Sequence, residues 1–257
     1  MSYIIFDLDD TLLPFNKEVS NYTKSVLERL RALGHRIVVN TARSKLHAQR
    51  LIDSIRPDFS ILCGGAGIID KDGNYIYRCE VPKETVKALS DELISLGKSV
   101  SVQSDTYLYT NDGSFVRFDV KLVDPKTFSF DFPAEKILLK LTPGESEHFA
   151  KKYGLRSVSY FGGPSYRFSH PNATKALGNS ALVKMFGDTE EDIVAFGDDV
   201  GDVEMLQSAG VGVIMKNAKD EVKKLVPRIS EYTCEEDGVA KFLVKHFGLD
   251  DSSFKNE

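Results

Sequence analysis

Short runs of apolar, mostly β-branched or aromatic residues alternate with longer segments of helical periodicity in the first part of the chain. The segments Tyr3–Phe6, Arg36–Asn40 and Ser60–Cys63 are typical of fully buried strands. Between the first two, residues 18–33 have apolar positions at helical spacing, and Gly34 predicts the end of that helix. A strand, a helix and a second strand in this order predict a parallel pair with a right-handed crossover.

The pattern changes near Val81 and Pro82. Residues 81–171 combine two helical segments with several short β segments, and the alternation of strands and helices returns from Asn172. We therefore predict an α/β protein with a doubly wound, parallel-sheet core formed by residues 1–80 and 172–257. Residues 81–171 are predicted to form an inserted α+β domain on two linkers.

Composition narrows the class of protein further. The chain has 257 residues and a formal net charge of −5, so it offers no basic surface typical of nucleic-acid binding. Its longest apolar runs are too short to span a bilayer, and the N-terminus does not resemble a secretory signal. Three widely separated cysteines argue against disulfides and a zinc site. We expect a cytoplasmic protein, monomeric or a weak homo-oligomer, with no nucleic-acid or membrane partner.

Polar residues with potential chemistry follow the predicted strands or begin a predicted helix. In doubly wound sheets, ligands bind beyond the carboxyl ends of the strands, where such side chains would meet. Carboxylates that share a site repel each other unless a cation lies between them, and hard oxygen ligands suit Mg²⁺. A lysine and a divalent cation together favour an anionic ligand, for which phosphate is the obvious candidate. The residues concerned are Asp7, Asp9, Thr41, Lys175, Asp198 and Asp202.

Each of these residues also has an ordinary structural interpretation. Asp7 and Asp9 could belong to an acidic, solvated turn, and Lys175 could be a solvated lysine. Thr41 and Asp202 could each cap the helix that follows. Four such clusters at compatible spacings are hard to obtain by chance, which favours their interpretation as one site.

As a set, the motifs resemble those of the haloacid dehalogenase superfamily of phosphatases. Its first motif is similar to Asp7-Leu-Asp9-Asp10-Thr11-Leu-Leu13, and its second to Thr41-Ala-Arg43. Lys175 stands in a segment similar to the third motif, and residues 197–205 resemble the fourth. The segments 209–218 and 236–239 are similar to the Cof-type sugar-phosphatase branch, which has a large α/β cap between its second and third motifs. The resemblance implies that residues 81–171 form this cap.

The resemblance also implies a role for each acidic and phosphate-binding residue. Asp7 would be the nucleophile and a Mg²⁺ ligand. Asp9 would be the general acid and base, its backbone carbonyl would bind the metal, and its pKa is expected to be raised by the crowded acidic site. The other Mg²⁺ ligands would be Asp198, directly, and Asp202, directly or through water. The phosphate would be held by Thr41, Lys175 and the backbone N–H groups of Leu8 and Ala42.

We therefore predict a Mg²⁺-dependent phosphatase that hydrolyses a small phosphorylated metabolite through an aspartyl-phosphate, with sugar phosphates as the favoured class. Two alternatives stay open. A phosphomutase or phosphotransferase would hand the phosphoryl group to another hydroxyl rather than to water. A catalytically weak phosphate-ester-binding regulator is suggested by Gly201, which stands where the fourth motif usually has Asn. Asp10, Ala42 and Ala176 also replace common glycines, and none of these changes removes a charged catalytic group.

Further candidates for contacts with the substrate lie mainly in the predicted cap. Arg117, Asp119 and Lys121 would share one face of a strand because side chains alternate along it. The alternative is that the charged residues among the cap candidates form a solvated strand face and the aromatic ones pack in the core of the cap. In the predicted catalytic core, Arg43 could bind phosphate or form a surface ion pair, and Asn217 could reach the cap or the substrate. The remaining cap candidates are Tyr160, Tyr166 and Arg167.

Overall fold

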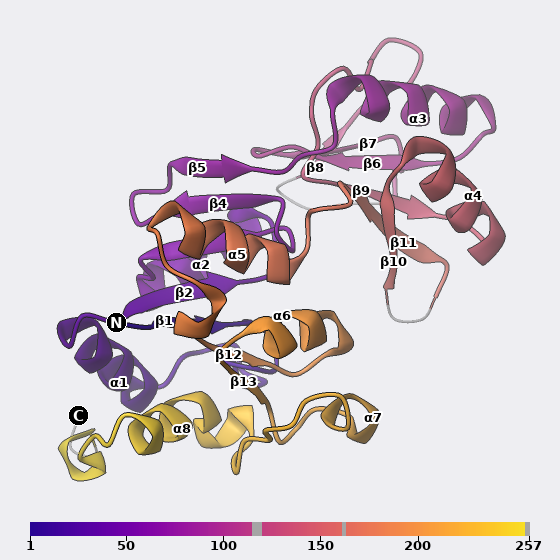
Figure 1. The fold of residues 1–257 in the computed structure, drawn as a ribbon. Coiled ribbons are helices and arrows are strands. Elements are labelled where there is room, and N and C mark those ends of the chain that lie inside the picture. Colours follow the sequence, from indigo (N-terminus) through magenta and orange to yellow (C-terminus); the bar gives the residue numbers. More distant parts are fainter. Residues whose placement is uncertain (115–119, 161–162, 255–257) are drawn as a thin grey trace.

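Two β-sheets, each with helices packed against it, make up the fold (Figure 1). The computed structural model describes residues 1–114, 120–160 and 163–254. The larger sheet has the strand order β13-β12-β1-β2-β3-β4-β5, in which β13 to β3 run parallel and β4 and β5 continue as an antiparallel hairpin. Its strands are β1 Tyr3–Phe6, β2 Arg36–Asn40, β3 Phe59–Leu62, β4 Gly67–Asp70, β5 Tyr75–Arg78, β12 Ile193–Gly197 and β13 Val211–Ile214.

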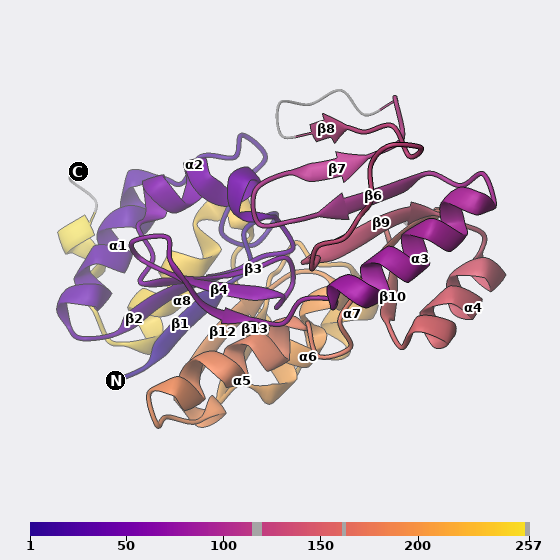
Figure 2. The same cartoon turned by 90° about the horizontal axis from the view of Figure 1, so that it is seen from above.

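Helices cover both faces of this sheet. Ile4 and Phe6 point into one apolar layer and Tyr3 and Ile5 into the other, because successive side chains of a strand face opposite ways. The first layer is formed with α1 Asn21–Ala32, α2 Lys45–Ile55 and α8 Gly238–His246, and the second with α5 Lys175–Met185, α6 Val203–Ser208 and α7 Asp220–Lys223. Figure 2 shows α2 and α5 on opposite sides of the strands. The predicted α/β class with a parallel core sheet is confirmed.

The second sheet is mixed and has the order β10-β11-β9-β6-β7-β8. It pairs antiparallel except between β7 and β8, and α3 Lys83–Ser95 and α4 Pro143–Tyr153 pack on one of its faces. Val86 and Phe149 from these helices are buried against Ile137 and Phe168 from the sheet. The strands are β6 Val100–Gln103, β7 Leu108–Thr110, β8 Val120–Leu122, β9 Lys136–Lys140, β10 Arg156–Tyr160 and β11 Ser165–Ser169. We call this second unit the cap.

The parallel pairing around β1 positions the candidate site. Phe6 is paired with Val39 on β2 and with Phe196 on β12, so the loops that follow these three strands begin side by side. Helix α5 lies close against the sheet, because a Cβ atom at Gly178 would be only 2.7 Å from the Ile61 side chain. Among the helices described, none combines the length and the apolar character that crossing a bilayer requires.

Candidate active site

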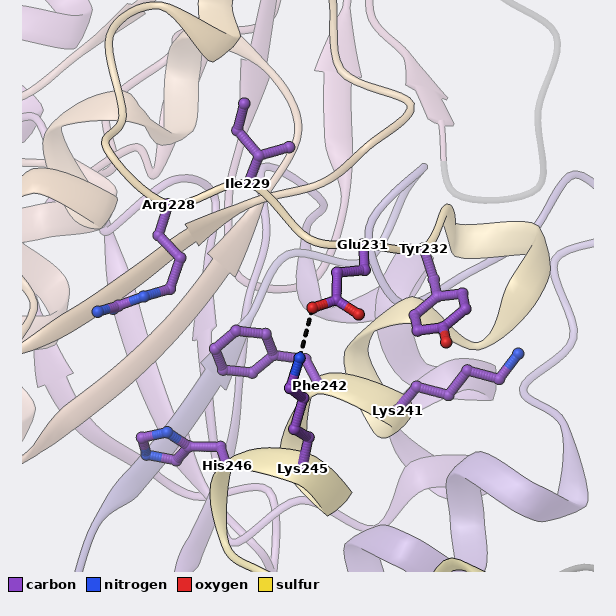
Figure 3. Close-up of a pocket in the computed structure, with 8 residues that line it drawn as sticks. All are labelled: Arg228, Ile229, Glu231, Tyr232, Lys241, Phe242, Lys245 and His246. Atoms are coloured by element: carbon purple, nitrogen blue, oxygen red, sulfur yellow. Dashed lines mark hydrogen bonds and ion pairs between the residues drawn. The ribbon is translucent and has the colours of Figure 1, made fainter.

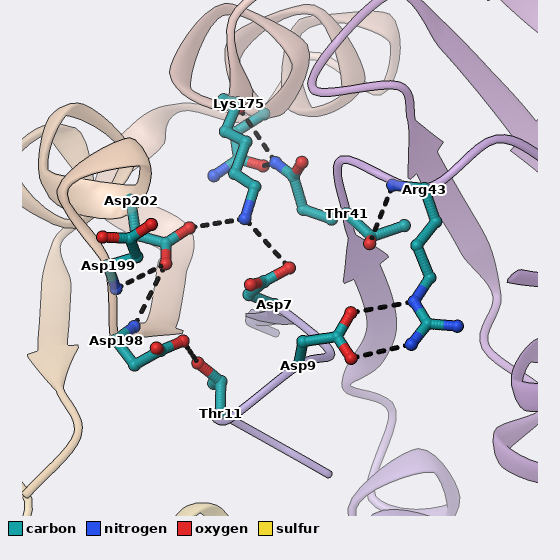
Figure 4. A network of polar contacts seen from close by, with 11 residues as sticks. Asp7, Asp9, Thr11, Thr41, Arg43, Lys175, Asp198, Asp199 and Asp202 are labelled. Atoms are coloured by element: carbon teal, nitrogen blue, oxygen red, sulfur yellow. Dashed lines mark hydrogen bonds and ion pairs between the residues drawn. The ribbon is translucent and has the colours of Figure 1, made fainter. Parts of the chain in front are cut away.

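Three carboxylates meet at the carboxyl ends of β1 and β12 (Figure 4). Asp7 directly follows β1, and Asp198 and Asp202 follow β12. One oxygen from each lies within 4.8 Å of the others, and Asp202 is 1% exposed. The sequence expectation that these side chains gather beyond adjacent parallel strands therefore agrees with the geometry.

The ammonium group of Lys175 lies between two of these carboxylates. Its Nζ is 2.9 Å from Asp7 Oδ1 and 2.5 Å from Asp202 Oδ1. Lys175 is the first residue of α5, which begins where the Thr174 hydroxyl accepts a hydrogen bond from the backbone N–H of Leu177. Burial lowers the pKa of Lys175, but the charges of Asp202 and Asp7 outweigh it and leave the pKa above its usual value. The lysine is thus a permanent cation in the cluster.

Two of the three carboxylates, those of Asp198 and Asp7, are poorly compensated by the protein alone. Burial raises the pKa of Asp198 to about 7, and nearby Asp202 and Asp7 add to this effect. Burial also raises the pKa of Asp7, against the opposing effect of Lys175. A group of three close carboxylates is the donor set that a hard divalent cation prefers. The residues present therefore fit a Mg²⁺ site formed by Asp7, Asp198 and Asp202.

The phosphate-binding candidates surround Asp7. The backbone N–H of Leu8 lies close enough to the Asp7 carboxyl group to lower its pKa. Thr41 is buried beyond β2, and its hydroxyl accepts a hydrogen bond of 3.2 Å from the backbone N–H of Arg43. The alternative that Thr41 caps the next helix is wrong, because the cap position of α2 is Ser44.

Asp9 departs from the sequence expectation. Its carboxylate is turned toward Arg43, whose Nε and Nη2 donate hydrogen bonds of 2.8 and 2.7 Å (Figure 4). Lys17 Nζ lies 3.1 Å from Asp9 Oδ1. Burial raises the pKa of Asp9, but the hydrogen bonds and charge of Arg43, helped by Lys17, lower it below its usual value. The expected raised pKa is therefore wrong, because the sequence did not reveal this cationic pair.

The ion pair leads to a testable pH effect. A general acid must be protonated, so loss of the Arg43 charge should raise the pKa of Asp9 and extend activity to higher pH. We expect the alkaline limb of kcat/KM against pH to move upward in Arg43→Met. Lys17→Met should move it less, because Lys17 makes a single, longer and more exposed contact. An alkaline limb that stays in place in Arg43→Met would contradict Asp9 as the acid.

Two further contacts of the site were not anticipated. The Thr11 hydroxyl donates a 2.6 Å hydrogen bond to Asp198, and Lys136 Nζ from the cap donates a 2.9 Å hydrogen bond to the backbone carbonyl of Ala42. The position of Thr11 within the first motif was a usable signal for its contact. Nothing in the local sequence pointed to Lys136, because its partner lies 94 residues away.

The remaining candidates for substrate contacts are not all placed at the acidic cluster. The Asn217 amide donates a hydrogen bond to the Asp10 carbonyl and accepts one from the Cys234 backbone N–H; its reach toward the cap or the substrate stays a prediction. Arg117 and Asp119 lie outside the described residues. At Gly201, a Cβ atom would meet nothing within 4 Å, so packing does not exclude a side chain there.

A hollow of about 370 Å³ beside α8 is separate from the acidic cluster (Figure 3). Its charged groups are partly engaged with each other, since Lys245 pairs with Glu231 at 2.5 Å and Lys241 lies over the Tyr232 ring. None of the residues that line it belongs to the cluster, so it plays no part in the site described here. The lining residues are Arg228, Ile229, Glu231, Tyr232, Lys241, Phe242, Lys245 and His246.

The sequence matches the family described as haloacid dehalogenase-like hydrolase over residues 4–243. The chain belongs to this family. The match spans both sheets of this haloacid dehalogenase-like hydrolase, and it confirms the superfamily and the enzyme class indicated by the four motifs.

Named relatives of this hydrolase are phosphatases. It is 27% identical over 272 residues to 5-amino-6-(5-phospho-D-ribitylamino)uracil phosphatase YitU of Bacillus subtilis, with 96% of this chain and 97% of the relative covered. It is 26% identical to the HMP-PP phosphatase of Klebsiella pneumoniae, with 93% of each chain covered. The structure of the HAD subclass IIB sugar phosphatase BT4131 has a TM-score of 0.76 at 22% identity, covering 96% of this chain and 99% of that one. The last comparison shows a shared fold.

Proposed function

We propose that this hydrolase is a Mg²⁺-dependent phosphatase of small phosphorylated metabolites, with sugar phosphates as the first class to test. The observation that carries the proposal is the placement of Asp7, Asp198 and Asp202 around one ion-sized site, with the Lys175 ammonium group beside them. The phosphatase names of two relatives support the same type of reaction.

Asp7 is the proposed nucleophile. Its carboxylate oxygen would bond to phosphorus while the bond from phosphorus to the ester oxygen breaks, which leaves an aspartyl-phosphate on the enzyme. Lys175, 2.9 Å from Asp7, would orient that carboxylate and balance charge on the phosphoryl oxygens. Mg²⁺ held by Asp7, Asp198, Asp202 and the backbone carbonyl of Asp9 would supply further positive charge there. The other proposed phosphate contacts are the Thr41 hydroxyl and the backbone N–H groups of Leu8 and Ala42.

Asp9 is the proposed general acid and base. It would donate a proton to the leaving oxygen and then accept one from the water that attacks the aspartyl-phosphate. That second step releases inorganic phosphate and restores Asp7. Because Asp9 is held by Arg43 in the present structure, its role requires that it exchange this ion pair for the leaving group when substrate binds.

Residues 81–171 are proposed to act as a cap domain over a catalytic core of residues 1–80 and 172–257. Closure of such a cap would exclude water from the site and bring specificity contacts to the leaving group. The hydrogen bond from Lys136 to Ala42 supports this role, because it joins the cap sheet to the loop that holds the phosphate-binding candidates.

The first test is hydrolysis of 4-nitrophenyl phosphate by the purified protein with Mg²⁺ and with EDTA, followed by a panel of sugar phosphates and other phosphorylated metabolites. We expect inorganic phosphate and alcohol in equal amounts, and only with Mg²⁺. An isomerised ester without phosphate release would favour the phosphomutase. Ester binding without turnover would favour a catalytically weak regulator. That alternative is based on Gly201, which has no side chain where the fourth motif usually has Asn.

A further inference from the structure

The cap sheet has one face without helices, and that face contacts the catalytic core. Phe168 on β11 points into the apolar layer under α3 and α4, so its neighbour Arg167 points to the opposite face. The same alternation on β9 puts Ile137 in the apolar layer and Lys136 on the opposite face, where Lys136 reaches the Ala42 carbonyl. Figure 1 shows α3 and α4 on the side of the cap away from the larger sheet.

This sheet is rich in positive charge. Its six described strands contain five basic residues and no acidic one, although the whole chain has a net charge of −5. Three of the basic side chains have acidic or carbonyl partners, and Lys121 lies over the Tyr107 ring. The five residues are Lys121, Lys136, Lys140, Arg156 and Arg167.

Arg167 differs from the others because it has no partner among the described residues. Its Nε is buried without a hydrogen bond. The buried carboxylate of Glu135 on the neighbouring segment is already engaged, since it accepts hydrogen bonds from the Tyr75 hydroxyl at 2.6 Å and from the Cys63 thiol at 3.0 Å. A partly buried cation without an anion is costly, so an anionic partner supplied by a ligand would stabilise it.

The guanidinium group of Arg167 lies over the Gly64–Gly65 turn, which contacts Thr41 and Thr174. A Cβ atom at Gly64 would be 2.7 Å from its Nη1, so the group lies directly over this glycine. The backbone N–H of Gly64 donates to the Thr41 carbonyl at 2.9 Å, and Gly65 packs against the backbone of Thr174, the residue before Lys175. Arg167 therefore covers a turn that contacts both Thr41 and the residue before Lys175.

We propose that Arg167 binds a second acidic group, a carboxylate or another phosphate, in the leaving group of the substrate. The inference rests on the proposed phosphatase function and names its substrate class, phosphate esters of acidic metabolites. A phosphate at Lys175 lies in the core, so the leaving group of its ester extends toward the cap, where Arg167 is a cation without a hydrogen-bonded or ion-paired partner among the residues that the structure describes. Lys136, Lys140 and Arg156 share this face of the sheet with Arg167, and their positive charge favours the same kind of ligand.

Matched pairs of substrates test the proposal. We expect kcat/KM to be higher for 6-phosphogluconate than for sorbitol 6-phosphate, and higher for fructose 1,6-bisphosphate than for fructose 6-phosphate. A charge-assisted contact of this kind corresponds to roughly tenfold or more. The first pair differs in a carboxylate and the second in a phosphate, so the two results together show which acidic group the enzyme prefers. Arg167→Met should remove the preference while activity on 4-nitrophenyl phosphate stays near that of the wild type, and Arg167→Lys should keep part of the preference.

Lys140→Met is the matched control for general charge. Lys140 is on the neighbouring strand β9, but its side chain is 59% exposed and paired with Asp112, so its loss should leave the preference unchanged. The absence of any preference in the wild type would overturn the proposal. So would an equal loss on both members of a pair in Arg167→Met, which would place Arg167 at the transferred phosphate or in the fold.

A binding measurement separates this proposal from the proposed function. If no ester is hydrolysed, the phosphatase assignment fails, and calorimetry with the Asp7→Asn protein still tests Arg167. We expect this protein to bind 6-phosphogluconate at least roughly tenfold more tightly than sorbitol 6-phosphate, and the double variant Asp7→Asn/Arg167→Met to bind both alike. Equal binding of the two esters by Asp7→Asn would reject the acidic subsite.

Discussion

Replacing Asp7 by Asn is expected to lower turnover by roughly 10⁴-fold or more, because losses of this size follow removal of a covalent nucleophile. The amide keeps the size of the side chain and cannot attack phosphorus. The fold should survive the change, because burial already disfavours the ionised form of Asp7. Steady-state hydrolysis of 4-nitrophenyl phosphate, with circular dichroism and a thermal melt as checks of folding, measures the effect.

Asp10→Asn is the matched control for this variant. It makes the same chemical change three residues further along, where the side chain is 63% exposed. The backbone of Asp10 has φ 57°, a conformation that Asn tolerates well, so the control should fold and retain activity. Turnover close to the wild-type level in Asp7→Asn, or an equal loss in both variants, would reject Asp7 as the nucleophile.

The sequence was most informative about residues whose position depends only on the order and pairing of the strands. Tyr3–Phe6 and the apolar run within 192–196 both indicate buried strands, observed as Tyr3–Phe6 and Ile193–Gly197, and buried strands alternating with helices imply a parallel sheet. Residues that follow adjacent parallel strands must lie at the same edge, so the meeting of Asp7 with Asp198 could be anticipated. The β4–β5 hairpin also follows from local sequence, because Asp72-Gly73 between two apolar β segments is a strong hairpin signal.

The sequence was least informative about which partner each charged side chain takes. Asp9 lies in an acidic stretch, so local sequence suggested a raised pKa, whereas its two ion pairs come from Arg43 and Lys17. The Lys136 contact with Ala42 depends on how the cap lies against the core, which strand periodicity does not determine. Long side chains can reach several partners at similar cost, and only the tertiary arrangement selects among them.

Replacing Asp198 by Asn is expected to remove the stabilisation by Mg²⁺ together with the activity. In the absence of a cation the Asp198 carboxylate lies near Asp7 and Asp202, so the neutral amide relieves repulsion and can still accept the Thr11 hydrogen bond. The ion-free variant should therefore melt no lower than the ion-free wild type. Phosphatase activity of the variant should fall close to background at any Mg²⁺ concentration that saturates the wild type.

Thermal melts with increasing Mg²⁺ distinguish loss of the ion from loss of the fold. Binding to the folded state alone should stabilise the wild type by about 2.7 kcal/mol at a hundred times Kd, and should stabilise Asp198→Asn much less. Asp199→Asn is the control, because it changes the adjacent, exposed carboxylate, which caps the next turn, to a residue that also caps well. An equal Mg²⁺-induced rise of the melting temperature in wild type and Asp198→Asn would mean that the ion binds elsewhere. In that case the melting temperature of Asp202→Asn should also rise with Mg²⁺ as in the wild type, because all three proposed ligands lie within one small cluster. That result would reject the proposed metal site.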